Sequence, residues 1–125
     1  MNILSREQVI RLHKKLIEST GGLDGIRDEG LLESALSSPF QTFDGKELYP
    51  SVISKIARVA YSLVCNHPFV DGNKRIGTYV MMVLLDINHI AVNFSDDDII
   101  RIGLSLAEGN VTDEQLIAII LKKTL

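Results

Sequence analysis

The sequence predicts an all-α protein: a bundle of about six helices around a central buried helix, with one short β-hairpin. Three observations carry this prediction, namely repeated helix-capping patterns, one segment that is apolar on every side, and a single hairpin turn signal. The length of 125 residues is typical of one domain, so we expect a single domain over residues 1–125. With 46% hydrophobic and 23% charged residues, the composition excludes a disordered, collagen-like or coiled-coil chain.

Three helices are predicted by capping boxes, in which a hydroxyl residue is followed three positions later by Gln or Asp. Apolar residues then recur at the spacing of one helix face in each segment. The predicted helices run from about Arg6 to Glu18 after Ser5, from Asp96 to Glu108 after Ser95, and from Asp113 to Lys123 after Thr112.

Three more helices are expected between these. Asp28 should cap a short helix that runs through Leu36 after a glycine-rich loop. Pro50 suits the first turn of a longer helix to about Asn66. Residues 73–88 contain an unbroken apolar run, which predicts a helix buried on all sides at the centre of the bundle. Between the second and third helices, Asp44-Gly45 predicts a hairpin over residues 41–48 that lies on the surface as a flap.

The charge and the cysteine content exclude several classes of partner and site. The net charge is −3 and the pI about 5.5, with no basic run longer than two residues, so direct nucleic-acid binding is not expected. The N-terminus lacks the pattern of a signal peptide, and the longest uncharged apolar stretch is about half of what a bilayer requires. We therefore expect a cytoplasmic protein without a membrane partner. Its single cysteine excludes a disulfide scaffold and a thiolate zinc site.

Residues 67–75 join the two longest predicted helices and hold the best candidate for chemistry. Pro68 should end the first helix at His67, and either Asp71 or Asn73 should cap the second. The free amides of that second helix favour an anion. Phe69 is interpreted as an apolar anchor for the loop.

The charged residues in this segment specify the anion further. Lys74 and Arg75 lie on the unfavourable side of the helix dipole, a conflict that a bound phosphate would remove. Asp71 beside a phosphate is typical of a bridging Mg²⁺, and His67 is suited to act as a general base. The residues therefore predict phosphoryl or nucleotidyl transfer onto a hydroxyl, but spacing alone leaves open a plain inter-helix turn with solvated charges.

This segment resembles the Fic family, whose signature reads His-Pro-Phe-x-(Asp/Glu)-Gly-Asn-Gly-Arg-x-x-Arg. Two positions differ, because Lys74 replaces a Gly and Thr78 replaces the second Arg. Both differences are similar to the death-on-curing (Doc) branch, toxins of toxin–antitoxin modules, as is the segment Gly25–Leu36. The residues that match in register are His67, Pro68, Phe69, Asp71, Gly72, Asn73 and Arg75.

The resemblance implies a compact Fic-like bundle that uses ATP and Mg²⁺. It assigns His67 as the base and Asp71 as the Mg²⁺ ligand, with an anion hole formed by Gly72, Asn73, Lys74 and Arg75. Fic proteins usually transfer AMP, whereas Doc-type toxins phosphorylate a threonine of elongation factor Tu. The bulk and charge of Lys74, and the loss of the second Arg at Thr78, favour the kinase over AMP transfer onto a protein hydroxyl.

The resemblance also implies two protein contacts. In Fic proteins a hairpin pairs with the target as an added strand, which assigns docking to the flap residues Phe43, Asp44, Gly45 and Lys46. Self-inhibited Fic proteins carry a helix with a characteristic Glu, and neither of the two Glu-Gly pairs in this chain follows that pattern. We therefore expect inhibition by a separate antitoxin, bound in a hydrophobic groove of the bundle. A third hypothesis is a catalytically silent helical module that only binds such a partner. His13 is interpreted as surface or core filler.

Overall fold

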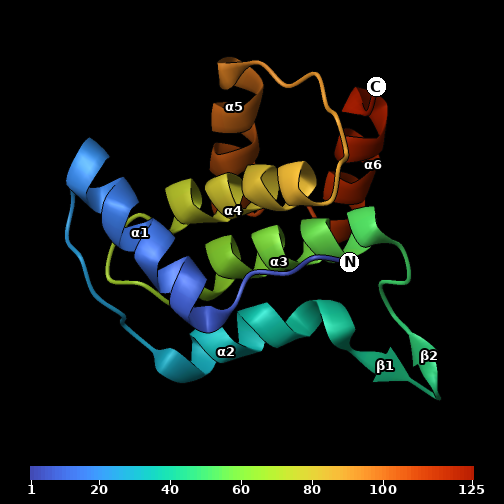
Figure 1. Cartoon of the computed structure of the whole chain (residues 1–125), viewed down its shortest axis with the longest axis horizontal. Helices are drawn as coiled ribbons and strands as arrows, with labels where there is room; N and C mark the ends of the chain where they lie inside the picture. Colours follow the sequence, from blue (N-terminus) through green and yellow to red (C-terminus); the bar gives the residue numbers. More distant parts are fainter.

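Six α-helices and one hairpin follow each other along the chain in the predicted order, and the computed structural model describes residues 1–125 throughout (Figure 1). The only sheet is the two-stranded antiparallel hairpin, so the predicted all-α class is confirmed. No helix is long and apolar enough to cross a bilayer. The elements are α1 (Arg6–Thr20), α2 (Glu29–Ser37), the 3-10 turn η1 (Ser38–Phe40), β1 (Thr42–Phe43), β2 (Lys46–Glu47), α3 (Val52–Asn66), α4 (Asn73–Ile87), α5 (Asp96–Ala107) and α6 (Asp113–Lys123).

The predicted capping boxes begin α1, α5 and α6, each with both reciprocal hydrogen bonds in place. Asp28 caps α2 by accepting the amide hydrogen of Leu31. The start of α3 differs from the prediction, because a further capping box forms between Ser51 and Ser54. Pro50 therefore precedes the cap instead of occupying the first turn, and the helix begins at Val52.

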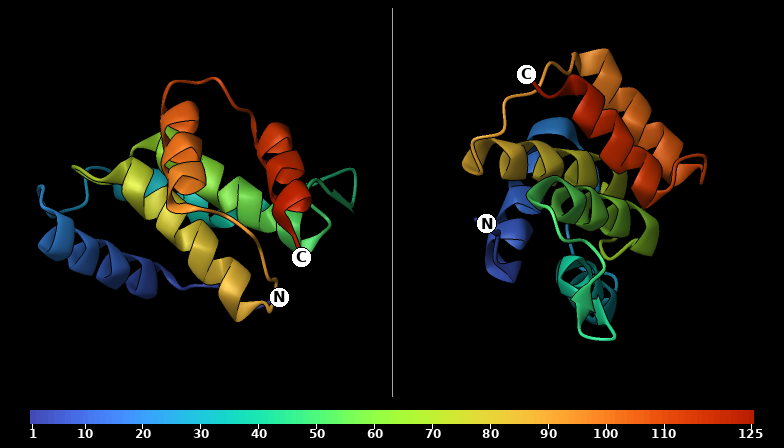
Figure 2. Two further views of the ribbon diagram at one scale, coloured as in Figure 1. Left: turned by 90° about the horizontal axis from the view of Figure 1, so that it is seen from above. Right: turned by 90° about the vertical axis from the view of Figure 1, so that its right-hand side faces the viewer.

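The centre of the bundle is formed by α3, which contacts α2, α4, α5 and α6 (Figures 1 and 2). The sequence predicts that residues 73–88 form the central helix, but α4 keeps a partly exposed face on which Tyr79 is 45% exposed. The two helices pack closely because Gly77 lacks a side chain: a Cβ there would lie 2.4 Å from Cγ2 of Val64. The apolar run of α4 is thus buried mainly by its crossing with α3.

The hairpin forms where the sequence predicts it, with Phe43 opposite Lys46. Its two turn residues both have positive φ, 52° at Asp44 and 76° at Gly45, as an Asp-Gly hairpin turn requires. The hairpin lies next to the start of α3, whereas residues 67–72 follow the end of the same helix (Figures 1 and 2). The predicted flap and the predicted chemistry therefore lie at opposite ends of α3.

Candidate active site

His67 follows the last residue of α3 and adopts a left-handed backbone conformation, with φ 49° and ψ 54°. This conformation turns the chain out of the helix, and the His67 residue is exposed. The side chain of Arg27 holds the turn, because its Nε donates to the carbonyl of His67 at 2.6 Å and its Nη2 to that of Asn66 at 3.0 Å. A cation at a helix C-terminus is also favoured by the helix dipole.

Residues 68–70 are held by the segment between α1 and α2. The amides of Arg27 and Asp28 both donate to the carbonyl of Pro68, and the amide of Val70 donates to the carbonyl of Gly25. Phe69 is fully buried, which confirms its predicted role as the loop's anchor. Its ring stacks on the buried His13 ring with centroids 3.8 Å apart.

Neither predicted side chain caps α4, and this prediction was wrong. Gly72 occupies the N-cap position in a left-handed conformation with φ 76°, which favours glycine. The side chain of Asn73 turns back instead, accepting from the amide of Phe69 and donating to its carbonyl, each at 3.0 Å. No side chain accepts from the first turn of α4, so its amides are available to an anion.

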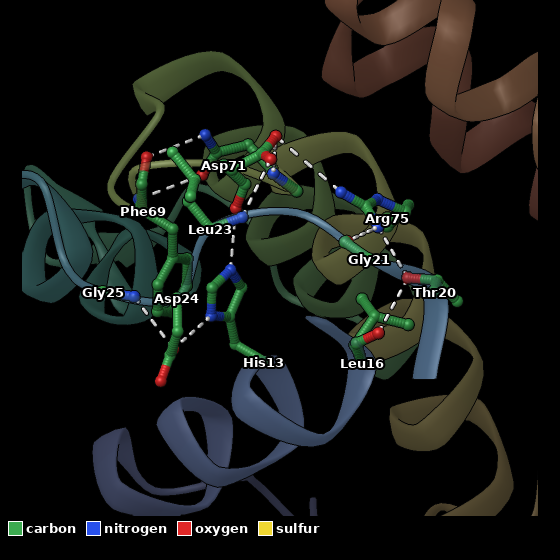
Figure 3. A network of polar contacts seen from close by, with 12 residues as sticks. His13, Leu16, Thr20, Gly21, Leu23, Asp24, Gly25, Phe69, Asp71 and Arg75 are labelled. Atoms are coloured by element: carbon green, nitrogen blue, oxygen red, sulfur yellow. Dashed lines mark hydrogen bonds and ion pairs between the residues drawn. The ribbon is translucent and has the colours of Figure 1, made fainter. Parts of the chain in front are cut away.

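Asp71 lies at the tip of the loop with each carboxylate oxygen accepting one backbone amide, Oδ1 from Gly72 at 2.8 Å and Oδ2 from Leu23 at 3.2 Å (Figure 3). These amides, that of Leu23 first, hold the pKa of Asp71 below its usual range. The carbonyl of Asp71 is bonded to Nε2 of His13 at 2.7 Å. The carboxylate is therefore oriented and ionised at neutral pH.

The two cations of the motif differ in how they are held. Arg75 is half-buried, and its Nη1 donates to Oγ1 of Thr20 at 2.6 Å and to the carbonyl of Gly21 at 2.7 Å. Its Nη2 lies 3.7 Å from the Asp71 carboxylate (Figure 3). Lys74 is exposed and forms no ion pair. Arg75 thus organises the site, whereas Lys74 is the freely available positive charge.

All six residues that the sequence assigned to catalysis, phosphate binding and metal binding line one cavity of about 470 Å³. The hairpin residues do not contribute to it, so the structure does not bring the predicted docking flap to the site. The cavity is lined by His67, Val70, Asp71, Gly72, Asn73, Lys74, Arg75 and Ala107.

With a single carboxylate in the cavity, a magnesium ion there would have to take further ligands from a nucleotide. Asp71 is its only acidic lining residue, and neither this cavity nor any other part of the protein brings together three His, Cys, Asp or Glu side chains that could hold a metal ion. One ionised carboxylate matches the way Mg²⁺ binds, through one or two carboxylates and substrate phosphates. Each Asp71 oxygen accepts one amide hydrogen and retains a further lone pair.

Sequence reasoning missed two residues that build the site. His13 was interpreted as surface or core filler; it is buried, at 1% exposure, and it also supports both Phe69 and Asp71, which that interpretation did not include. Arg27 lies within the segment Gly25–Leu36, whose similarity to the Doc branch assigns no role to this residue. Their contacts join residues 40 and 58 positions apart, which local spacing does not reveal.

The part of the chain that holds this cavity matches a known protein family. Residues 3–85 match the Fic/DOC family, and this segment contains every residue lining the cavity except Ala107. The protein Toxin Doc of Mycolicibacterium smegmatis is 39% identical to the chain over 79 residues. That match covers 62% of this chain and 61% of the relative, so it spans about three fifths of the relative's length.

Proposed function

The chain belongs to the Fic/DOC family, and from this premise we propose that it is a toxin that transfers the γ-phosphate of ATP to a threonine or serine hydroxyl of a translation factor. Elongation factor Tu is the target we propose, in line with the resemblance to Doc-type toxins. Phosphorylation of that factor would block protein synthesis.

The observation that supports transfer chemistry is the convergence of four kinds of group on one cavity. The residues that line this cavity supply an imidazole, a carboxylate, a free ammonium and the uncapped first turn of a helix. A structural turn needs no such combination. A phosphate between the amides of α4 and Lys74 would also remove the unfavourable pairing of a cation with the helix N-terminus.

His67 is the base in the reaction that we propose. The target hydroxyl gives its proton to a ring nitrogen of His67 while its oxygen bonds to the γ-phosphorus. The bond from that phosphorus to the β–γ bridging oxygen breaks, and ADP leaves. Mg²⁺ held by Asp71 and the phosphates would neutralise charge on the nucleotide. Lys74 and the α4 amides stabilise the charge on the transferred group.

The residue at position 78 favours phosphoryl over AMP transfer. Thr78 is buried, and its hydroxyl donates back to the carbonyls of Lys74 and Arg75. It therefore offers no cation to a phosphate tail that extends beyond the anion hole. AMP transfer onto a protein hydroxyl is the second candidate, because the base, the carboxylate and the amides would serve either reaction.

The test is to incubate the purified chain with elongation factor Tu and Mg²⁺·ATP and to measure the intact mass of the factor. We expect one added phosphate. An added AMP would contradict the kinase proposal and support the second candidate. No adduct on elongation factor Tu, followed by none in a whole lysate, would support the third hypothesis of a catalytically silent module.

Matched variants make this test specific. His67→Asn removes the base but suits the left-handed backbone, since Asn tolerates that region better than most residues. His89→Asn is the control, because His89 is also exposed and has φ 60°. We expect transfer to disappear in the first variant only.

The place of the hairpin bears on how the target would dock. If a target strand pairs with Phe43–Lys46, the same target must also reach His67 at the other end of α3, about 22 Å away for a 15-residue helix. We therefore propose a folded protein as the substrate. A short peptide carrying the acceptor hydroxyl should be a much poorer substrate than the whole factor.

We also propose a separate antitoxin as the partner that controls the toxin. The chain carries no internal helix with the family's self-inhibition pattern. Growth arrest on expression, relieved by co-expression of a neighbouring gene, would support this proposal. Growth arrest that no neighbouring gene relieves would contradict it.

A further inference from the structure

His13 is the only buried histidine in the chain, and its ring lies between two acidic residues (Figure 3). Its Nε2 lies 2.7 Å from the carbonyl oxygen of Asp71. A carbonyl oxygen only accepts a hydrogen bond, so Nε2 carries the hydrogen and donates it. The opposite nitrogen, Nδ1, lies 3.5 Å from Oδ1 of Asp24. The ring therefore connects α1 and the loop that follows it to the residue proposed as the Mg²⁺ ligand.

The place of the His13 ring is fixed by its packing. The ring stacks on that of Phe69, with centroids 3.8 Å apart and an angle of 9° between the two planes. Phe69 is itself buried, and both its amide and its carbonyl are hydrogen-bonded to the side chain of Asn73. A side chain that is locked in this way can hold a neighbouring group in one geometry.

The first oxygen of the Asp71 carboxylate is aimed through the backbone. The carbonyl of Asp71 and the amide of Gly72 belong to one planar peptide group, so a bond that holds the carbonyl also fixes the direction of the amide hydrogen. That amide donates to Oδ1 of Asp71 at 2.8 Å. His13 therefore determines where Oδ1 lies, although its own hydrogen bond is to the backbone.

The second oxygen is aimed by the glycine-rich loop of residues 21–25. The amide of Leu23 donates to Oδ2 of Asp71 at 3.2 Å. The loop also packs directly against this oxygen, because a Cβ at Gly22 would lie only 2.6 Å from it. Asp24, on the same loop, faces the ring of His13. The two oxygens of the carboxylate are thus held from two sides, by His13 through the backbone and by the loop directly.

We propose that His13 is the positioning residue of Asp71 and that, together with the loop 21–25, it sets how tightly the chain holds Mg²⁺ beside the phosphates of the nucleotide. This inference rests on the proposed function, in which Asp71 is the metal ligand, and adds the residues that aim it. Mg²⁺ demands near-ideal octahedral geometry, so a lone carboxylate must point at the metal in a fixed direction. Residues that orient a metal ligand commonly change the affinity for the metal by about 10- to 100-fold.

The experiment measures the binding of ATP by calorimetry, once with Mg²⁺ and once with a chelator in place of the metal. His13→Leu removes the donor to Asp71, and we expect the Kd for Mg²⁺·ATP to rise about tenfold or more. His13→Gln is the conservative variant and should recover most of the affinity, because its side-chain amide can donate to the same carbonyl. The Kd for ATP without metal should not change in either variant.

Gly22→Ala acts on the same carboxylate from the exposed loop. The added methyl group would displace Oδ2 of Asp71, so the Kd for Mg²⁺·ATP should rise more than the Kd for ATP alone. Gly109→Ala is the matched control, because this glycine also has positive φ, 76° against 116° at Gly22, and a Cβ there meets no atom within 4 Å. Circular dichroism shows which variants are folded, and this pair decides the test if the buried His13→Leu substitution prevents folding.

Two results would overturn the inference. In folded His13→Leu, an equal rise of both Kd values, or no rise in either, would show that His13 does not act through the metal ligand. Gly22→Ala with the same two Kd values as Gly109→Ala would show the same for the loop. An ATP affinity of the unaltered chain that does not depend on Mg²⁺ would instead contradict the proposed function, because Asp71 would then hold no metal.

Discussion

The two ends of α3 are built in opposite ways. At its C-terminal end, His67 is left-handed and exposed, Lys74 has no ion partner, and the first amides of α4 have no cap. At its N-terminal end, Tyr49 donates to Asp113 at 2.5 Å and Arg58 pairs with the same carboxylate at 2.9 Å. The comparison shows that the C-terminal end leaves polar groups open to a ligand, while Tyr49, Asp113 and Arg58 contact one another at the other end.

The largest expected effect is on the open end. His67→Ala should lower the rate of transfer by about 10²- to 10⁴-fold, the usual contribution of a positioned base. The free energy of unfolding should fall by at most about 1 kcal/mol, because the side chain is exposed but the left-handed backbone at this position suits Ala poorly. Single-turnover rates and urea unfolding measure the two quantities. Full activity in this variant would show that His67 is not the base.

The next effect concerns Arg27, whose side chain holds the turn at His67. Arg27→Gln removes a charged donor from the carbonyls of Asn66 and His67, and we expect kcat to fall roughly tenfold with an unchanged KM for ATP. Arg101→Gln, at an exposed position of α5, is the control. If KM rises instead, Arg27 acts on nucleotide binding and not as a positioning residue for the base.

A smaller effect is expected at the closed end. Tyr49→Phe should reduce the free energy of unfolding by about 1 kcal/mol, because the Asp113 carboxylate loses one hydrogen bond and keeps that of Arg58. Transfer activity should not change, since this contact is separated from His67 by the length of α3. A loss of activity that exceeds the loss of folded protein would show that the two ends are coupled.

The smallest effect is the pH dependence of stability. Burial and the hydrogen bond to Asp113 raise the pKa of Tyr49 to about 12 from its ordinary value of 10.0. Because the folded state resists ionisation, this contribution is complete below about pH 10 and is lost as the pH rises toward 12. Unfolding free energies of the unaltered protein and of Tyr49→Phe should therefore converge over that range. A difference in unfolding free energy that stays constant over this pH range would contradict the raised pKa of Tyr49.

Local rules predicted most of the fold. Capping boxes at Ser5, Ser95 and Thr112 gave the helix starts because each depends on side chains three residues apart. The site motif was also readable, since its residues are consecutive and one turn brings them together. The start of α3 was missed because Pro50 is a familiar first-turn residue and the Ser51/Ser54 pair lacks the usual Glu or Gln.

Long-range contacts were not predictable in the same way. Either Asp71 or Asn73 was expected to cap α4. The side chain of Asn73 instead forms two hydrogen bonds with Phe69, which use both its donor and its acceptor. The place of the hairpin relative to His67 depends on the direction of α3, which local sequence does not give. His13 and Arg27 act only through partners that folding brings to them.

The pairing of residues 25–28 with residues 68–70 has a consequence for synthesis of the protein. Closing this loop requires both segments, so it belongs to the slower, non-local part of folding. A nascent chain in which Arg75 has not yet left the ribosome lacks the anion hole. It also lacks the hydrogen bonds that Arg75 donates to Thr20 and Gly21. The candidate site thus cannot form until more than half of the chain has emerged from the ribosome.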